Sequence, residues 1–125
     1  MPPNRKAKRT SQALTRSAIR SANKSALKKV NVPEWGGDVY VSAIKANEFE
    51  RFRDKIASNG QADKAMMIGG LVSLVACDSQ GKRLFTDDDA ERVSEFALAP
   101  LLRVFRAAMK FNNLSEDDVD ELVKN

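Results

Sequence analysis

The stretch ADKAMMIGGLVSLVAC, residues 62–77, is the most apolar segment of the chain. Its length and all-round hydrophobicity predict a central, buried helix. A strand over LVSLVAC, residues 71–77, remains the alternative, because periodicity cannot separate a buried helix from a buried strand in so short a run. The pair Gly69-Gly70 is not a phosphate-binding loop, since the flanking residues of a Walker or GxGxxG motif are missing.

Downstream of this segment, the chain repeats a helix-start signal. The turn residues DSQG at 78–81 come first. Thr86 then lies three residues before Asp89, and Ser115 lies three residues before Asp118. Both pairs predict an N-cap with a carboxylate in the first helical turn. A calcium or magnesium loop is rejected, because the spacing lacks the alternating ligands, central glycine and distant glutamate of an EF-hand.

Between these two caps, an apolar stripe with i, i+3, i+4, i+7 spacing predicts another helix. Its members are Leu98, Leu101, Leu102, Phe105 and Met109. We expect it to pack inside the protein, although Leu98, Leu101 and Phe105 are also candidates for binding a partner. Pro100 either kinks this helix or occupies its first turn. A last short apolar edge follows at Val119, Leu122 and Val123.

Upstream of the apolar segment, Asn47 and Glu50 have the spacing of an N-cap and its third helical residue. The helix that they open places three apolar residues on one stripe: Phe49, Phe52 and Ile56. Ser58-Asn59-Gly60 is expected to end it.

The residues before that helix predict a β-hairpin. VNVPEWGGDVYVSAI, residues 30–44, contains the single Trp and the single Tyr of the chain. A Gly-Gly pair can adopt a type I′ turn, so residues 30–35 are expected to pair with residues 38–44. This register places Val32 opposite Val41, and Val30 opposite Ala43.

The hairpin has two chemically different faces. Val30, Val32, Val39 and Val41 form an aliphatic face suited to a core, whereas Pro33, Trp35 and Tyr40 form an aromatic face. The aromatic face fits a core and an interface equally well, and its three residues are candidate partner-binding residues. Pro33 cannot donate a ladder hydrogen bond, so the first strand should lie at the edge of its sheet.

Charge divides the chain into an arm and a body. Residues 1–30 carry nine Lys or Arg and no acid, whereas residues 86–125 carry five bases and ten acids. We expect residues 1–29 to be a flexible basic arm with at most a weak amphipathic helix, and residues 30–125 to be the helical domain. The arm is a solvated segment, a contact for nucleic acid or another anionic surface, or a transit peptide.

Composition argues against catalysis. The chain has no His, which removes the commonest general base near neutral pH and the commonest metal ligand. We expect no catalytic residue, cofactor or metal. The lone Cys77 has no basic neighbour to activate it and is expected to be a small buried hydrophobe. No apolar run approaches the roughly 20 residues of a membrane span, so no membrane is expected.

The order of these motifs resembles a known family. VPEWGGDVYV at 32–41, DSQGKRLFTDDD at 78–89 and FNNLSEDDVDEL at 111–122 are similar to stretches of the tail assembly chaperones of long-tailed bacteriophages and prophages. ALTRSAIR, residues 13–20, is similar to their usual start. The arm is longer and more basic than in the family, and Pro100 interrupts a stretch that relatives usually fill with Ala.

The resemblance implies a fold, a role and partners. The fold is mainly α, a small helical domain with a short N-terminal β-hairpin. The role is non-catalytic: members of the family bind the tape measure protein, keep it soluble and recruit tail tube subunits, in the host cytoplasm and not in the mature virion. Self-assembly, including a spiral form, and a longer frameshifted product also belong to the family. The rival functions are nucleic-acid binding through the arm and a structural head–tail connector.

Overall fold

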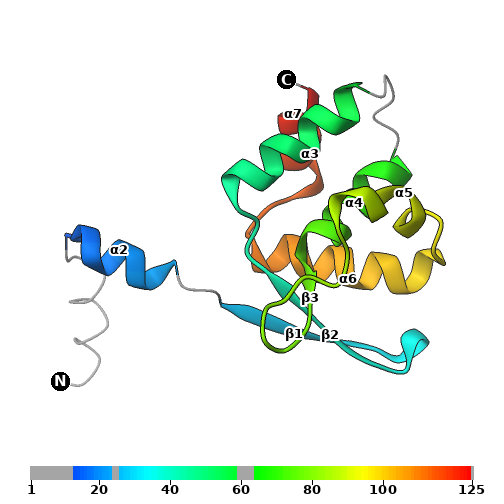
Figure 1. Ribbon diagram of the computed structural model, residues 1–125, viewed down its shortest axis with the longest axis horizontal. Coiled ribbons are helices and arrows are strands. Elements are labelled where there is room, and N and C mark those ends of the chain that lie inside the picture. Colours follow the sequence, from blue (N-terminus) through cyan, green and yellow to red (C-terminus); the bar gives the residue numbers. More distant parts are fainter. Residues whose placement is uncertain (1–12, 24–25, 59–63, 125) are drawn as a thin grey trace.

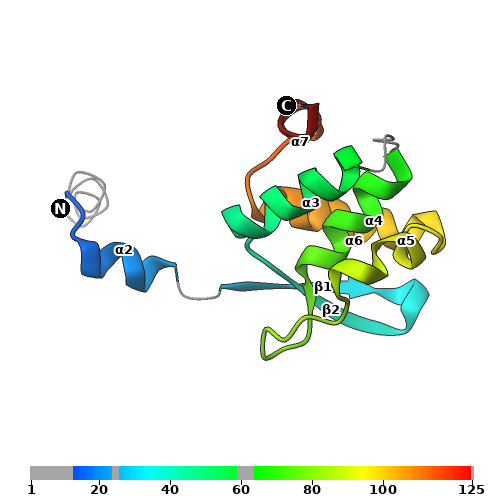
Figure 2. The same ribbon diagram turned by 45° about the horizontal axis from the view of Figure 1, so that its top comes forward.

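The computed structural model describes residues 13–23, 26–58 and 64–124, and it is mainly helical with a small antiparallel sheet (Figure 1). The sheet has the strand order β1-β2-β3, and the helices that follow the hairpin in the chain gather on one side of it (Figures 1 and 2). The elements are α2 Arg16–Ala22, β1 Leu27–Val32, η1 Pro33–Trp35, β2 Gly37–Ser42, α3 Ala46–Ser58, α4 Lys64–Val75, β3 Ala76–Cys77, η2 Asp87–Asp89, α5 Ala90–Val93, α6 Leu98–Phe111 and α7 Glu116–Lys124. The prediction of a mainly α fold with a hairpin is confirmed.

Helix α4 is the centre of the body, as the apolar segment predicts. All nine residues from Met67 to Val75 are buried, and α3, α5 and α6 contact this helix. The strand alternative for residues 71–77 is wrong except at its end. Ala76 and Cys77 leave the helix and pair with Val41 and Tyr40 of β2.

The hairpin forms, but the predicted register is wrong. Val30 lies opposite Val39, and Val32 lies opposite Gly37. The reason is local: Pro33 begins a 3-10 turn over Pro33–Trp35, and Gly36 ends it at φ +80°, so four residues connect the strands. Strand β1 also begins at Leu27, three residues before the predicted boundary of the arm.

The aliphatic residues of the hairpin share one face in the observed register, as they do in the predicted one. Val30, Val32 and Val41 are buried and Val39 is partly buried, so the aliphatic face closes the core as predicted. Helix α6 packs against both β1 and β2. The prediction that β1 is an edge strand is confirmed, since β2 lies between it and β3.

The local caps explain where several helices begin. The Ser115 hydroxyl accepts a hydrogen bond from the Asp118 backbone N–H at 3.0 Å, and the Asp118 carboxylate accepts one from the Ser115 N–H at 2.9 Å. Asp89 accepts likewise from the Thr86 N–H at 2.8 Å, which lowers the pKa of its carboxyl. Both predicted caps are confirmed. Asn47 is not an N-cap, because α3 already begins at Ala46.

Helix α6 contains the predicted apolar stripe, whose first residue is exposed and whose later residues are buried or partly buried. Pro100 occupies the first turn, where its missing N–H needs no partner within the helix. Leu101, Phe105 and Met109 are buried, Leu102 is partly buried and Leu98 is 62% exposed. At the far end, the Asn112 amide accepts from the Ile44 N–H at 2.8 Å and donates to the Ser42 carbonyl at 3.3 Å, which ties α6 to the end of β2.

The remaining predictions concern the chain ends and one loop. Val119 of α7 is buried, whereas the side chains of Leu122 and Val123 lie outside the described part. Residues 1–12 of the predicted arm and Asn59-Gly60 after α3 also lie outside the described residues. Among the described residues, no helix combines the length and hydrophobicity needed to cross a membrane.

Candidate functional site: an aromatic surface at the hairpin tip

The hairpin tip presents Trp35 at the end of a 3-10 turn. Pro33 fixes the start of the turn, and the N–H of Gly36 donates to the Pro33 carbonyl at 3.0 Å. Trp35 is therefore the last residue of η1, with its side chain 39% exposed. A large aromatic side chain held at this level of exposure is available to a partner and still oriented by its neighbours.

Three aromatic rings connect the tip to the body. Trp35 packs edge-on against Phe96, with ring centroids 6.2 Å apart and an interplanar angle of 87°. Phe96 in turn meets Phe85 at 6.0 Å and 63°. Phe96 is itself 39% exposed. Segments that are about 60 residues apart in the chain thus share one aromatic cluster, with ring geometry in the preferred range.

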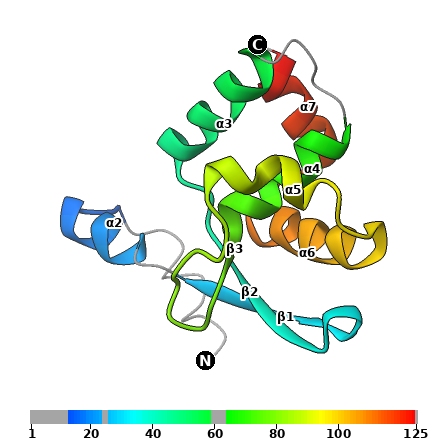
Figure 3. The same ribbon diagram turned by 45° about the vertical axis from the view of Figure 1, so that its right-hand side comes forward.

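Two leucines near the start of α6 follow Phe96 closely in the chain. Leu98 and Leu102 line a shallow, open hollow with Ala99, Arg103 and Arg106. We call Trp35, Phe96, Leu98 and Leu102 the tip surface. The turn after β1 contacts α6, and Figure 3 shows the two elements near each other. The tip surface is the part of the described body where several large apolar side chains are exposed together.

An ion pair fixes the tip against α6. The Arg103 guanidinium donates to both carboxylate oxygens of Glu34, through Nε at 3.1 Å and Nη2 at 2.6 Å. These hydrogen bonds lower the pKa of the Glu34 carboxyl. Because the contact is bidentate, it sets the orientation of the turn as well as its distance from the helix.

The candidate partner-binding residues divide into three groups. Trp35 and Leu98 lie exposed within the tip surface, and Pro33 is exposed at the start of the same turn. Tyr40, the fourth residue of β2, is partly buried and is paired with Lys29 and Cys77. Leu101 and Phe105 are 2% and 3% exposed, so in this conformation they contribute to the core.

Phe96 is the residue of this surface that the sequence analysis missed. It precedes the apolar stripe of α6 and belongs to no periodic pattern. Its contact with Trp35 joins two distant segments. The only signal in the sequence is an aromatic residue just outside a helical stripe, which by itself does not indicate a surface.

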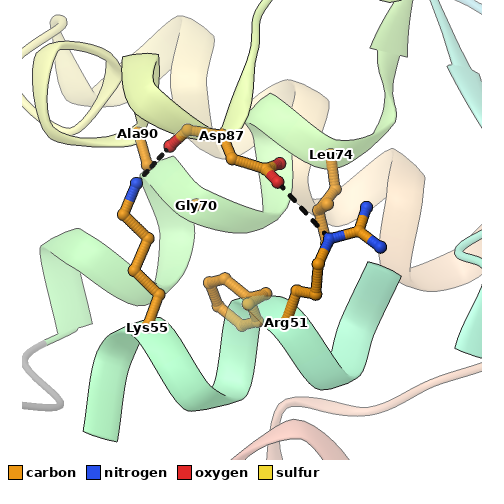
Figure 4. A pocket seen from close by; sticks show the side chains of 7 residues that line it. Arg51, Lys55, Gly70, Leu74, Asp87 and Ala90 are labelled. Carbon is orange, nitrogen blue, oxygen red and sulfur yellow. Dashed lines mark hydrogen bonds and ion pairs between the residues drawn. The ribbon is translucent and has the colours of Figure 1, made fainter. Parts of the chain in front are cut away.

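A second hollow, between α3 and η2, is a structural junction (Figure 4). Lys55 of α3 donates to the Asp87 carbonyl at 2.7 Å, and Arg51 lies 3.8 Å from the Asp87 carboxylate. Arg83 approaches the same carboxylate at 3.1 Å. The charged groups here pair with one another, so they hold α3 against η2.

Two observations concern metal ligands and the thiol of Cys77. Within residues 13–23, 26–58 and 64–124, no three His, Cys, Asp or Glu side chains are placed to hold a metal ion. Cys77 is buried, which raises the pKa of its thiol and favours the unreactive form. The prediction that Cys77 acts as a small buried hydrophobe is confirmed.

Comparison with known proteins gives one informative likeness. No family model matches the chain, and no curated protein matches it. Among solved structures, that of the bacteriophage HK97 tail assembly chaperone superposes with a TM-score of 0.59 at 20% identity. The match covers 90% of this chain and 99% of that chain.

The chain has a tail-assembly-chaperone-like fold. Because nearly the whole of both chains is covered, the likeness includes the hairpin and the helical body together, and not a single helix pair. At this level of identity the shared property is the fold.

Proposed function

We propose that this protein is a non-catalytic tail assembly chaperone. It binds the tape measure protein, keeps it soluble and recruits tail tube subunits. It acts in the host cytoplasm and is absent from the finished particle. The observation that supports this proposal most is the likeness to the HK97 tail assembly chaperone over 90% of the chain.

The tip surface supplies the chemistry that this role needs. A chaperone of a long apolar protein has to cover exposed hydrophobic side chains reversibly, which calls for accessible apolar groups on a rigid support. Leu98 is 62% exposed at the start of α6, and Trp35 is oriented by its contact with Phe96 and by the ion pair of its neighbour Glu34 with Arg103 of α6. The aromatic and leucine side chains can cover the apolar face of a helix.

Co-expression with the tape measure protein of the same tail gene cluster tests the proposal. We expect the tape measure to be soluble when the intact chain is present and to aggregate when it is absent, because its apolar segments are then uncovered. The measurement is the fraction of tape measure in the supernatant after centrifugation. An unrelated soluble protein of similar size, expressed at the same level, is the control.

Mass spectrometry of purified particles separates the chaperone from a structural connector. The chaperone is absent from particles, whereas a connector is present at stoichiometric levels. Equal aggregation of the tape measure with and without the chain would also contradict the proposal.

A further inference from the structure

Helix α2 is the one described element that leaves the body. Figures 1 and 2 show it beyond the N-terminal end of β1, away from the other helices. Every residue of Arg16–Ala22 is exposed. Its helical form is explained by local caps. The Thr15 hydroxyl accepts from the Ala18 N–H at 3.1 Å, and the Asn23 amide donates to the Ile19 carbonyl at 2.8 Å. An isolated helix of this length is marginal in water, so a partner would stabilise it.

The helix displays two arginines on one face. Arg16 and Arg20 are four residues apart, which places their side chains one above the other. Neither forms an ion pair with a carboxylate of the described residues. Lys28, at the start of β1, is exposed as well. Lys29, the next residue, pairs with Asp38 at 3.7 Å, whereas Arg16, Arg20 and Lys28 form no ion pair with the described residues.

We propose that α2, with Arg16 and Arg20 and the nearby Lys28, binds the phosphate backbone of double-stranded nucleic acid without reading its sequence. Arg16 and Arg20 are about 6 Å apart along the helix axis, within reach of phosphates that recur about every 3.4 Å along each strand. Guanidinium groups match phosphate oxygens in a bidentate geometry. Binding releases condensed counterions, which supplies the affinity.

The charge distribution of the whole chain supports an anionic ligand at this place. Residues 1–30 contain nine Lys or Arg and no acid, whereas residues 86–125 have twice as many acids as bases. The body thus repels nucleic acid and the arm attracts it.

Two further features favour a duplex over other anionic partners. Residues 1–30 contain no Phe, Trp or Tyr, so the arm lacks the rings on which single-stranded bases stack. Leu14 and Ile19 are the large exposed apolar residues of this region, but Leu14 lies before the start of α2, so Ile19 is the one large apolar residue on the helix itself. They do not make the continuous apolar face that insertion into a membrane surface requires.

Fluorescence anisotropy with short labelled duplexes of different sequence tests the inference on the full chain. We expect binding to weaken linearly on a log–log plot between about 50 and 200 mM salt. The variant with Arg16→Gln and Arg20→Gln should lower the magnitude of that slope by about 1.8 and weaken binding at low salt roughly tenfold. The matched variant with Arg92→Gln and Lys110→Gln removes two exposed charges from the body and should leave binding unchanged.

Three outcomes would overturn the inference. One is the absence of duplex binding by the intact chain at low salt. Another is an equal loss of binding in the arm variant and the body variant. The third is binding to phosphatidylserine vesicles without binding to duplexes, which would identify a membrane surface as the anionic partner. Because α2 contributes no buried residue, we expect the arm variant to fold like the parent. Circular dichroism of each variant checks this.

Discussion

Gly69 lies in the middle of α4, where an alanine would ordinarily be the better helix former. Here a Cβ atom would lie 2.7 Å from the backbone nitrogen of Ser94 and 2.8 Å from its Cα. The end of α5 therefore approaches the α4 backbone more closely than any side chain allows. At Gly70, the same substitution would meet only the ring edge of Phe52.

Gly69→Ala should lower the free energy of unfolding by about 1–3 kcal/mol, because the clash with the backbone of Ser94 outweighs the roughly 1 kcal/mol gained in helix propensity. Gly70→Ala should cost less, since the side chain of Phe52 can move. Urea unfolding followed by circular dichroism measures both. Gly37→Ala, with open space around the added methyl group and no positive φ, is the control expected to be near neutral. A Gly69→Ala protein as stable as the parent would contradict this account of the packing.

At the scale of elements, the docking of the hairpin on α6 depends on Glu34 and Arg103. The hydrogen bonds from Arg103 lower the pKa of the Glu34 carboxyl in the folded protein. A lowered folded pKa means that the contact stabilises the folded tip fully above the ordinary pKa of a glutamate. The contribution is lost as the pH falls through the lowered value.

Trp35 is the neighbour of Glu34 and the single Trp of the chain, so its fluorescence reports this contact. We expect the emission to be constant above about pH 4.5 and to change below it, as Glu34 takes up a proton and releases Arg103. Glu34→Gln should remove this transition and leave the tip in its low-pH state throughout. The same transition in Glu34→Gln would assign it to other carboxyls, such as those of Asp78 and Asp89, whose pKa values are also lowered.

At the scale of the whole molecule, local patterns predicted the parts that depend on local physics. The apolar run predicted the buried helix α4. The spacings from Thr86 to Asp89 and from Ser115 to Asp118 predicted caps that form in the structure. The alternation of valines predicted the buried face of the hairpin, because this face depends on side-chain parity and not on register.

The parts that depend on distant partners could not be read from the sequence. Strand β3 has two residues, and it exists only because β2 lies beside the end of α4. The hairpin register follows from the 3-10 turn that begins at Pro33 and ends at Gly36, which replaces the expected Gly-Gly turn. The contact of Trp35 with Phe96 joins two loops, so no periodic pattern indicates it.

The central claim, that the tip surface holds an apolar partner, is tested most directly by removing its two exposed anchors. Trp35→Ala with Leu98→Ser should leave the circular dichroism spectrum unchanged and weaken tape measure binding at least about tenfold, with aggregation of the tape measure on co-expression. Leu14→Ser with Ile19→Ser removes exposed apolar surface from α2 instead and should keep the tape measure soluble. Full solubility with the tip variant, or its loss with the α2 variant alone, would contradict the account.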